Sequence, residues 1–196
     1  MFRGNHNGVR DTSRTTRKVM DTSMGLTPLA GLMMGSRCGD IDASAVTYLM
    51  EKLNMKPQEM ADFLNKKSGV LGITGISSDM RDIENAANEG NEKAKLALRM
   101  YEYRIKKYIG AYTAAMGGVD AIVFTAGVGE NQTDLREDSC KNLEYLGIKI
   151  NKEVNDKVRG EEAIISTDDS KVKVVVVPTD EEIVIARDTM ELVANK

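Results

Sequence analysis

The chain has no tryptophan, one histidine and two cysteines among its 196 residues. A metal site or a hydrolytic triad built on histidine is not expected, because His6 is the single histidine and lies in a polar segment. Cys38 and Cys140 are too few and too far apart to indicate a metal site, so we interpret them as free thiols. The composition therefore argues against histidine-dependent and disulfide-stapled classes of protein.

Long apolar runs are missing as well. No stretch approaches the ~18 residues of a membrane span, and the first residues lack the apolar core of a signal peptide. We therefore expect a cytoplasmic protein with no membrane partner. The net charge is −3, with both signs spread along the chain, so no nucleic-acid partner is expected. Residues 1–17 are polar and basic, and we interpret them as a flexible basic arm in front of a folded domain at 18–196.

One segment, Asp120–Asn131, combines an apolar run with a Gly-x-Gly turn and the start of a polar helix. Gly127 and Gly129 permit positive φ and close approach of a ligand to the backbone. The N–H groups that open the next helix favour an anion, which suggests a nucleotide phosphate. Gln132 stands where a dinucleotide fingerprint has its third glycine, and no Gly-Lys-Ser/Thr follows. A turn that needs glycine for its geometry alone is the alternative.

Hydrophobic periodicity predicts an α/β fold around this segment. Helices are expected at 43–53, 57–64, 91–116 and 133–146, with a closing helix to about 193, and strands at 120–124, 163–166 and 172–177. Gly110 falls inside the longest helix, where glycine costs ~1 kcal/mol, and indicates close approach of another element. Because ligands collect beyond the carboxyl ends of strands, residues 125–131 and 179–182 are expected on one rim.

Charged residues in glycine-containing loops are candidates for binding. Arg37 lies between Gly35 and Gly39, and its guanidinium could grip two oxygens of an oxyanion; an ion pair with Asp40 is the alternative. Asp79 and Arg81 begin a predicted helix with Ser77 or Ser78 as cap. They could bind a ribose and a base or phosphate, or the acid could simply suit the helix dipole. Carboxylates at 180–182 suit either Mg²⁺ or a helix start.

Five motifs, in this order and spacing, resemble the acetate kinase family: Asp21–Gly25, Met34–Asp42, Ser77–Asp82, Phe124–Asn131 and Pro178–Arg187. The resemblance covers residue 18 to the end. It implies an α/β domain of the ribonuclease H-like, actin and sugar kinase type, with a mixed sheet and flanking helices. It corresponds to the carboxyl-terminal, nucleotide-binding half of family members.

The resemblance also implies phosphoryl transfer between ATP and acetate, giving acetyl phosphate and ADP. Arg37 matches the arginine that stabilises the transferring phosphoryl group. Glu181 matches the carboxylate that holds Mg²⁺, with Glu182 as its less favoured neighbour. The nucleotide ATP or ADP is expected at the adenosine turn and the ribose–phosphate loop, which match Asp79, Met80, Arg81, Gly127, Val128, Gly129, Glu130 and Asn131. Family members usually carry Phe or another apolar residue at the position of Met80.

The motifs of the family's amino-terminal domain, including its acetate-side arginine and catalytic histidine, have no counterpart in this sequence. We therefore expect a truncated form with weak or no activity alone, unless a partner chain supplies the other half. Alternatives are a catalytically silent module for nucleotide binding or dimerisation, because this half contributes to the family's homodimer contact, and a fragment of a propionate or butyrate kinase. A Rossmann-type dehydrogenase is disfavoured because the third glycine and a catalytic histidine are missing.

Overall fold

The computed structural model describes residues 8–10 and 19–194, apart from the side chains of residues 8–10 and of Glu181. A three-stranded sheet has the order β3 (Ala121–Phe124), β5 (Lys173–Val176), β4 (Ala163–Ile164). β3 and β5 run parallel, whereas β4 runs antiparallel to β5. The sheet is therefore mixed, and its strands lie within the ranges that the sequence predicts.

The side chains of β3 and β5 alternate between the core and a partly exposed position, as expected for a strand with one buried face. Ile122 and Phe124 of β3 are each 2% exposed, and Val174 and Val176 of β5 are completely buried. They form one apolar cluster with Ile105 and Ile109 of the longest helix and with residues between β3 and β5, such as Leu135 and Ile148. Burial of this cluster fixes where both strands end, and therefore where the polar residues after them lie.

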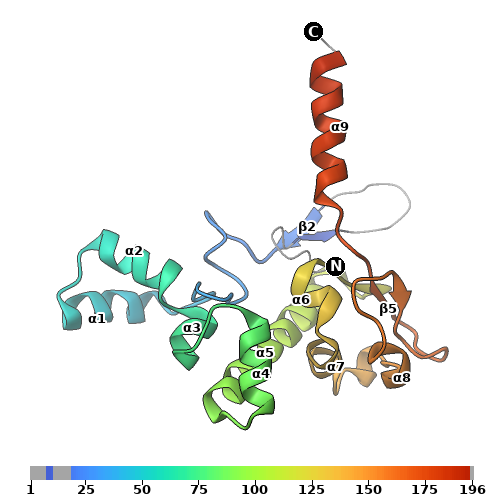
Figure 1. The fold of residues 1–196 in the computed structure, drawn as a ribbon, viewed down its shortest axis with the longest axis horizontal. Coiled ribbons are helices and arrows are strands. Elements are labelled where there is room, and N and C mark those ends of the chain that lie inside the picture. Colours follow the sequence, from blue (N-terminus) through green and yellow to red (C-terminus); the bar gives the residue numbers. More distant parts are fainter. Residues whose placement is uncertain (1–7, 11–18, 195–196) are drawn as a thin grey trace.

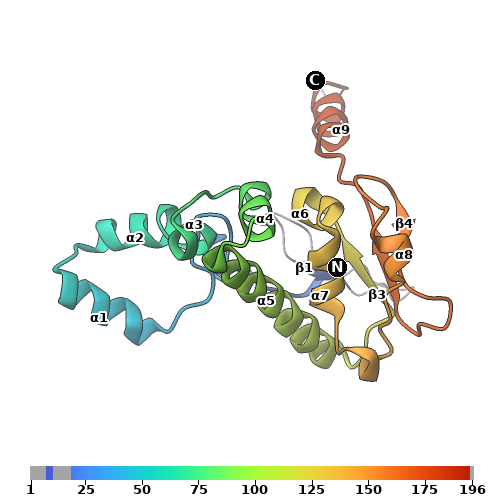
Figure 2. The same ribbon diagram turned by 60° about the horizontal axis from the view of Figure 1, so that its bottom comes forward.

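The longest helix, α5 (Glu92–Met116), connects two apolar clusters. Its amino-terminal part packs with α3 (Gly69–Thr74) and α4 (Met80–Asn88), and it also contacts α7 (Thr133–Cys140) (Figure 2). The Asn91 side chain caps its first turn, and Gly117, at φ 72°, ends it. The prediction that Gly110 marks close approach is wrong, because a Cβ placed there would meet nothing within 4 Å.

Six further helical segments complete the described part of the chain. They are α1 (Ala43–Leu53), α2 (Pro57–Lys66), α6 (Ala126–Asn131), the 3₁₀ turn η1 (Glu144–Leu146), α8 (Lys152–Asn155) and α9 (Glu181–Ala194). Two predictions need correction. Residues 69–74 form α3, where no helix is expected. Helix α7 ends at Cys140 instead of continuing to 146, because Asn142 adopts φ 63° and breaks the helix.

Helices α1 and α2 form a hairpin at the end of the molecule away from the sheet (Figures 1 and 2). Helix α1 forms where hydrophobic periodicity predicts it, yet none of its residues is buried. Within α2, Met60 and Leu64 are buried. Met50 and Met55 of the same hairpin are only half-buried.

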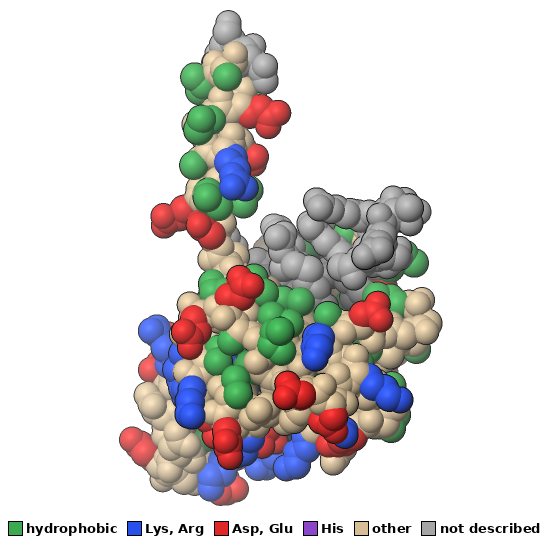
Figure 3. Space-filling view, turned by 90° about the vertical axis from the view of Figure 1, so that its right-hand side faces the viewer, with side chains coloured by type: hydrophobic (Ala, Val, Ile, Leu, Met, Phe, Trp, Pro, Cys, Tyr) green, Lys and Arg blue, Asp and Glu red, His purple; other side chains and the backbone are tan. Residues whose placement is uncertain are grey.

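Helix α9 projects away from the rest of the chain (Figure 1), and apolar side chains lie exposed along it (Figure 3). Ile185, Met190, Leu192 and Val193 are each at least 65% exposed. None of the described helices is long and apolar enough to cross a membrane. Most of the predicted arm, residues 1–17, lies outside the described residues; within it Gly8–Arg10 form strand β1, which pairs antiparallel with β2 (Val19–Thr22).

Candidate functional site

A cleft of about 990 Å³ is lined by the start of α4, by α6 and by Tyr101 and Ile105 of α5. It lies at the carboxyl end of β3, whose last residue, Phe124, also lines it. The predicted nucleotide-binding residues meet here: all of them except Glu130 line the cleft. Residues 79–81 and 127–131 are far apart in the sequence. Helix α4 packs on α5, and Val128 of α6 packs against the two apolar clusters to which α5 contributes, and this brings the two segments together.

The glycines of α6 act differently from the prediction. The helix already begins at Ala126, and Gly127 and Gly129 do not adopt positive φ; the unusual residue is Ala126, at φ 62°. A Cβ at Gly127 would meet nothing within 4 Å, so its absence keeps this side of the cleft open. A Cβ at Gly129 would lie 3.3 Å from the Phe124 carbonyl carbon, so this glycine lets α6 pack closely on the end of β3. The turn itself needs neither glycine.

Glu130 does not line the cleft, because its side chain ties two strand ends together. Its Oε1 accepts a hydrogen bond from Thr179 N at 2.8 Å. The Thr179 hydroxyl accepts from Ala126 N at 3.0 Å and lies 2.6 Å from the Thr125 hydroxyl. The loops after β3 and β5 are thus hydrogen-bonded to each other, as expected for one rim of the sheet. The Glu130 side chain is therefore engaged with Thr179, and a nucleotide contact of Glu130 stays a prediction.

Asp79 and Arg81 pair at the start of α4. Asp79, and not Ser77 or Ser78, is the cap: its Oδ1 accepts from Arg81 N at 2.9 Å, while Arg81 Nη2 donates to Asp79 Oδ2 at 2.6 Å. These hydrogen bonds from the Arg81 side chain and backbone lower the pKa of Asp79 to about 2. Asp79 is therefore ionised near neutral pH, and the Arg81 side chain, 83% exposed, stands at the edge of the cleft. Met80 lines the cleft and also packs in the apolar cluster of α4 and α5.

Arg37 lies in an adjoining hollow of about 570 Å³, between its own loop and α2. Met34, Gly35 and Ser78 line both spaces, so the two are neighbours. The loop is held by the first amides of α3 and the residue before it: Ser68 N donates to Ser36 O, Val70 N to Met34 O and Leu71 N to Gly35 O. Backbone contacts of this kind fix where the Arg37 side chain begins.

The alternative partner of Arg37, Asp40, is engaged elsewhere. Its Oδ2 accepts from the Tyr108 hydroxyl at 2.5 Å, and its Oδ1 accepts from Gly31 N at 2.8 Å. Burial, followed by this bond to Asp40, raises the pKa of Tyr108. Arg37 Nη1 instead lies 3.5 Å from the sulfur of Met34. The Arg37 guanidinium therefore lines the hollow and forms no ion pair with Asp40.

The predicted metal ligand, Glu181, has a side chain outside the described residues. Its neighbour Asp180 caps α9, because Asp180 Oδ1 accepts from Ile183 N at 3.0 Å. Among the described side chains, no three His, Cys, Asp or Glu residues gather closely enough to hold a metal ion. A nucleotide-bound Mg²⁺ needs only one or two protein carboxylates, because phosphate oxygens and water complete its shell. The donor chemistry at residues 180–182 fits that requirement.

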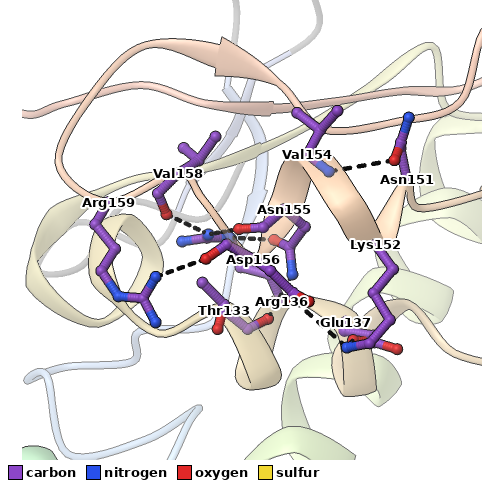
Figure 4. A network of polar contacts seen from close by, with 10 residues as sticks. All are labelled: Thr133, Arg136, Glu137, Asn151, Lys152, Val154, Asn155, Asp156, Val158 and Arg159. Atoms are coloured by element: carbon purple, nitrogen blue, oxygen red, sulfur yellow. Dashed lines mark hydrogen bonds and ion pairs between the residues drawn. The ribbon is translucent and has the colours of Figure 1, made fainter.

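Sequence reasoning missed Arg136 of α7, which is completely buried beside the cleft. Its Nη1 donates to the carbonyl oxygens of Gly129 and Glu130, both at 3.0 Å. Its other nitrogens bond to Asn155 and Val158, which follow in the chain (Figure 4). The sequence offers no signal for it, since an arginine on an amphipathic helix usually faces water.

Comparison with known proteins gives one consistent family. The sequence model described as "Acetokinase family" matches residues 6–187. An acetate kinase of Bacteroides thetaiotaomicron is 66% identical over 175 residues, which is 89% of this chain and 44% of the relative. The chain therefore spans less than half the length of the curated relatives that it matches.

Solved structures agree. Acetate kinase from Porphyromonas gingivalis superposes with a TM-score of 0.86 at 55% identity, covering 90% of this chain and 44% of that one. A propionate kinase from Francisella tularensis gives 0.79 at 40% identity, covering 86% and 43%. The α/β fold expected from the motifs is confirmed by these likenesses.

Proposed function

Because this chain belongs to the acetokinase family, we propose that it forms the nucleotide-binding half of a phosphotransferase acting between ATP and acetate. The observation that supports this most is the cleft of about 990 Å³, where the two predicted nucleotide segments meet. One segment supplies a helix without side chains at Gly127 and Gly129, and the other supplies a charged pair. A flat, polyphosphate-bearing ligand requires both an open backbone surface and cations at its edge.

Each residue has a defined task in this proposal. Asp79, Met80 and Arg81 bind the adenosine side of ADP or ATP, with Met80 as the apolar contact. Residues 127–131 border the ribose and phosphates, chiefly through their backbone and through Asn131, whose Nδ2 is already fixed by Gly127 O at 2.8 Å. Arg37 stabilises the transferring phosphoryl group, whose charge spreads over its equatorial oxygens. Glu181 would hold Mg²⁺, which when bound neutralises phosphate charge.

The carboxylate acceptor has less support from this chain. In a complete site, water must be excluded around the transferring group, and the chain spans less than half of its relatives. We propose acetate as the acceptor, with propionate as the second candidate because a propionate kinase superposes well. Butyrate is a third. Turnover by the chain alone is expected to be weak or undetectable.

Nucleotide binding gives the first test. Titration calorimetry with ADP and Mg²⁺ should detect binding, and Arg81→Ala should raise the Kd about tenfold through loss of a charge-assisted hydrogen bond. Arg99→Ala is the matched control, because Arg99 is an exposed arginine of α5 that does not line the cleft. Equal weakening by both substitutions would mean that only overall charge matters. Absence of binding by the unmodified chain would overturn the site assignment.

Catalysis gives the second test, because the competing function is a silent module that binds nucleotide or forms a homodimer. We expect acetyl phosphate formation from ATP and acetate to be at most a small fraction of that of an intact relative. Any turnover above background that Arg37→Ala abolishes would rule out the silent module. If turnover is zero, the remaining roles are nucleotide binding and dimerisation. Sedimentation of the chain tests the second role, since a dimerising module must sediment as a dimer.

A further inference from the structure

We propose that Arg136 is a positioning residue for the nucleotide cleft: its buried guanidinium fixes the carbonyl end of α6 against the segment 155–158. The inference rests on the proposed function for its consequence, but the arrangement itself is a property of this chain. Arg136 does not itself line the cleft, so it acts through the backbone of residues such as Gly129 that do.

The contacts of Arg136 use its whole donor capacity. A guanidinium carries five N–H groups in a fixed fork. Here Nε donates to Asn155 Oδ1 at 2.8 Å, and Nη2 donates to Asn155 O at 3.1 Å and to Val158 O at 2.7 Å (Figure 4). With the two bonds from Nη1 to Gly129 and Glu130, every N–H group has an acceptor. Asn155 is fixed in turn, because its Nδ2 donates to Thr133 O at 2.9 Å.

All of these acceptors are amide oxygens, and none is a carboxylate. Burial, with a smaller contribution from Arg159, lowers the pKa of Arg136 to about 10, so the side chain stays charged at neutral pH. A buried charge is a poor means of gaining stability alone, and its best-attested use is to specify one arrangement over others. The last carbonyl groups of a helix lack partners within that helix. In α6, Arg136 donates hydrogen bonds to two of these carbonyl groups, those of Gly129 and Glu130.

The fixed carbonyl groups lead directly to the cleft. Glu130, held by Arg136 through its carbonyl oxygen, reaches Thr179 N with its side chain and so connects the ends of β3 and β5. Gly160 N also donates to Glu130 O, at 3.2 Å. Arg159, between Val158 and Gly160, lines the cleft together with Gly127 and Gly129. One side chain therefore sets the spacing between α6 and the segment that carries Arg159.

The test uses the conservative substitution Arg136→Lys, which keeps the charge but loses the fork. If α6 and the segment 158–160 then adopt the relative position needed for binding only about a tenth of the time, the apparent Kd for ADP with Mg²⁺ rises about tenfold. Amide hydrogen exchange should accelerate at residues 127–131 and 158–160, while exchange in α5 stays slow. The control is Leu143→Ala, a buried apolar residue of the same core that does not line the cleft.

The outcomes separate positioning from general stability. Weaker ADP binding and faster local exchange in Arg136→Lys, with neither in Leu143→Ala at a comparable loss of unfolding stability, support the proposal. Equal weakening in both variants, or unchanged exchange at 127–131 in Arg136→Lys, overturns it. If the unmodified chain does not bind ADP, the proposed function fails, yet the exchange measurement still decides whether Arg136 holds α6 and the segment 158–160 in place.

Discussion

Replacing Gly69 with alanine is expected to destabilise the chain by roughly 2–5 kcal/mol, the sum of left-handed backbone strain and steric overlap. Gly69 adopts φ 60°, where a Cβ is unfavourable. That Cβ would lie 2.2 Å from Met34 O and 2.7 Å from Arg37 O. Both neighbours are backbone atoms, so the loop that carries Arg37 has to move. Urea unfolding followed by circular dichroism measures the loss.

A matched glycine provides the control. Gly110→Ala adds a methyl group inside α5 where nothing lies within 4 Å, so it should stabilise the chain by about 0.5–1 kcal/mol. Opposite signs for the two substitutions would support the geometry of the Arg37 loop. An unchanged unfolding midpoint in Gly69→Ala would show that the loop does not pack on α3 as described.

The second large effect is expected at Arg136. Substitution by methionine keeps an unbranched apolar stem but removes every donor, leaving oxygen atoms of Gly129, Asn155 and Val158 without this partner in the interior. Because each buried acceptor left unsatisfied costs ~1–3 kcal/mol, the free energy of unfolding should fall by about 3–5 kcal/mol. The same urea titration measures it.

Arg159→Met is the comparison for this variant. Arg159 is exposed and donates to Asp156 O at 2.7 Å, so its loss should change stability by no more than about 0.5 kcal/mol. The expected difference between two arginines only 23 positions apart comes from burial and from the number of hydrogen bonds that each side chain donates. Similar unfolding midpoints for both variants would contradict the network drawn in Figure 4.

Local sequence signals identified much of the fold. The periodicity of residues 43–53 and 91–116 reflects which side chains can share a helix face, and both helices form with the expected ends. The apolar runs at 120–124 and 172–177 become β3 and β5 because both are buried in one core. Helix α7 fails the same reasoning: its amphipathic pattern continues past Cys140, but Asn142 turns the chain in a left-handed conformation that periodicity does not encode.

The candidate site divides in the same way. The motifs identified Asp79, Arg81 and the α6 segment, because glycine and paired charges in a fixed order carry a chemical requirement that is readable from residue types. The motifs could not tell which atoms face the cleft. The side chain of Glu130 reaches Thr179, and Asp40 bonds to Tyr108 instead of to Arg37. Those choices depend on partners 49 and 68 positions away.

By itself, the sequence determined the family and the α/β class, since residue identity and spacing carry that information, and it predicted which two segments would bind a nucleotide. Only the tertiary structure decided that these segments share one cleft, that Gly127 and Gly129 serve close packing and open space instead of a turn, and that Arg136 lies in the interior. The physical reason is that burial and hydrogen-bond satisfaction are settled by contacts between distant elements. A buried arginine such as Arg136 can hold neighbouring segments together only where folding surrounds its N–H groups with carbonyl oxygens.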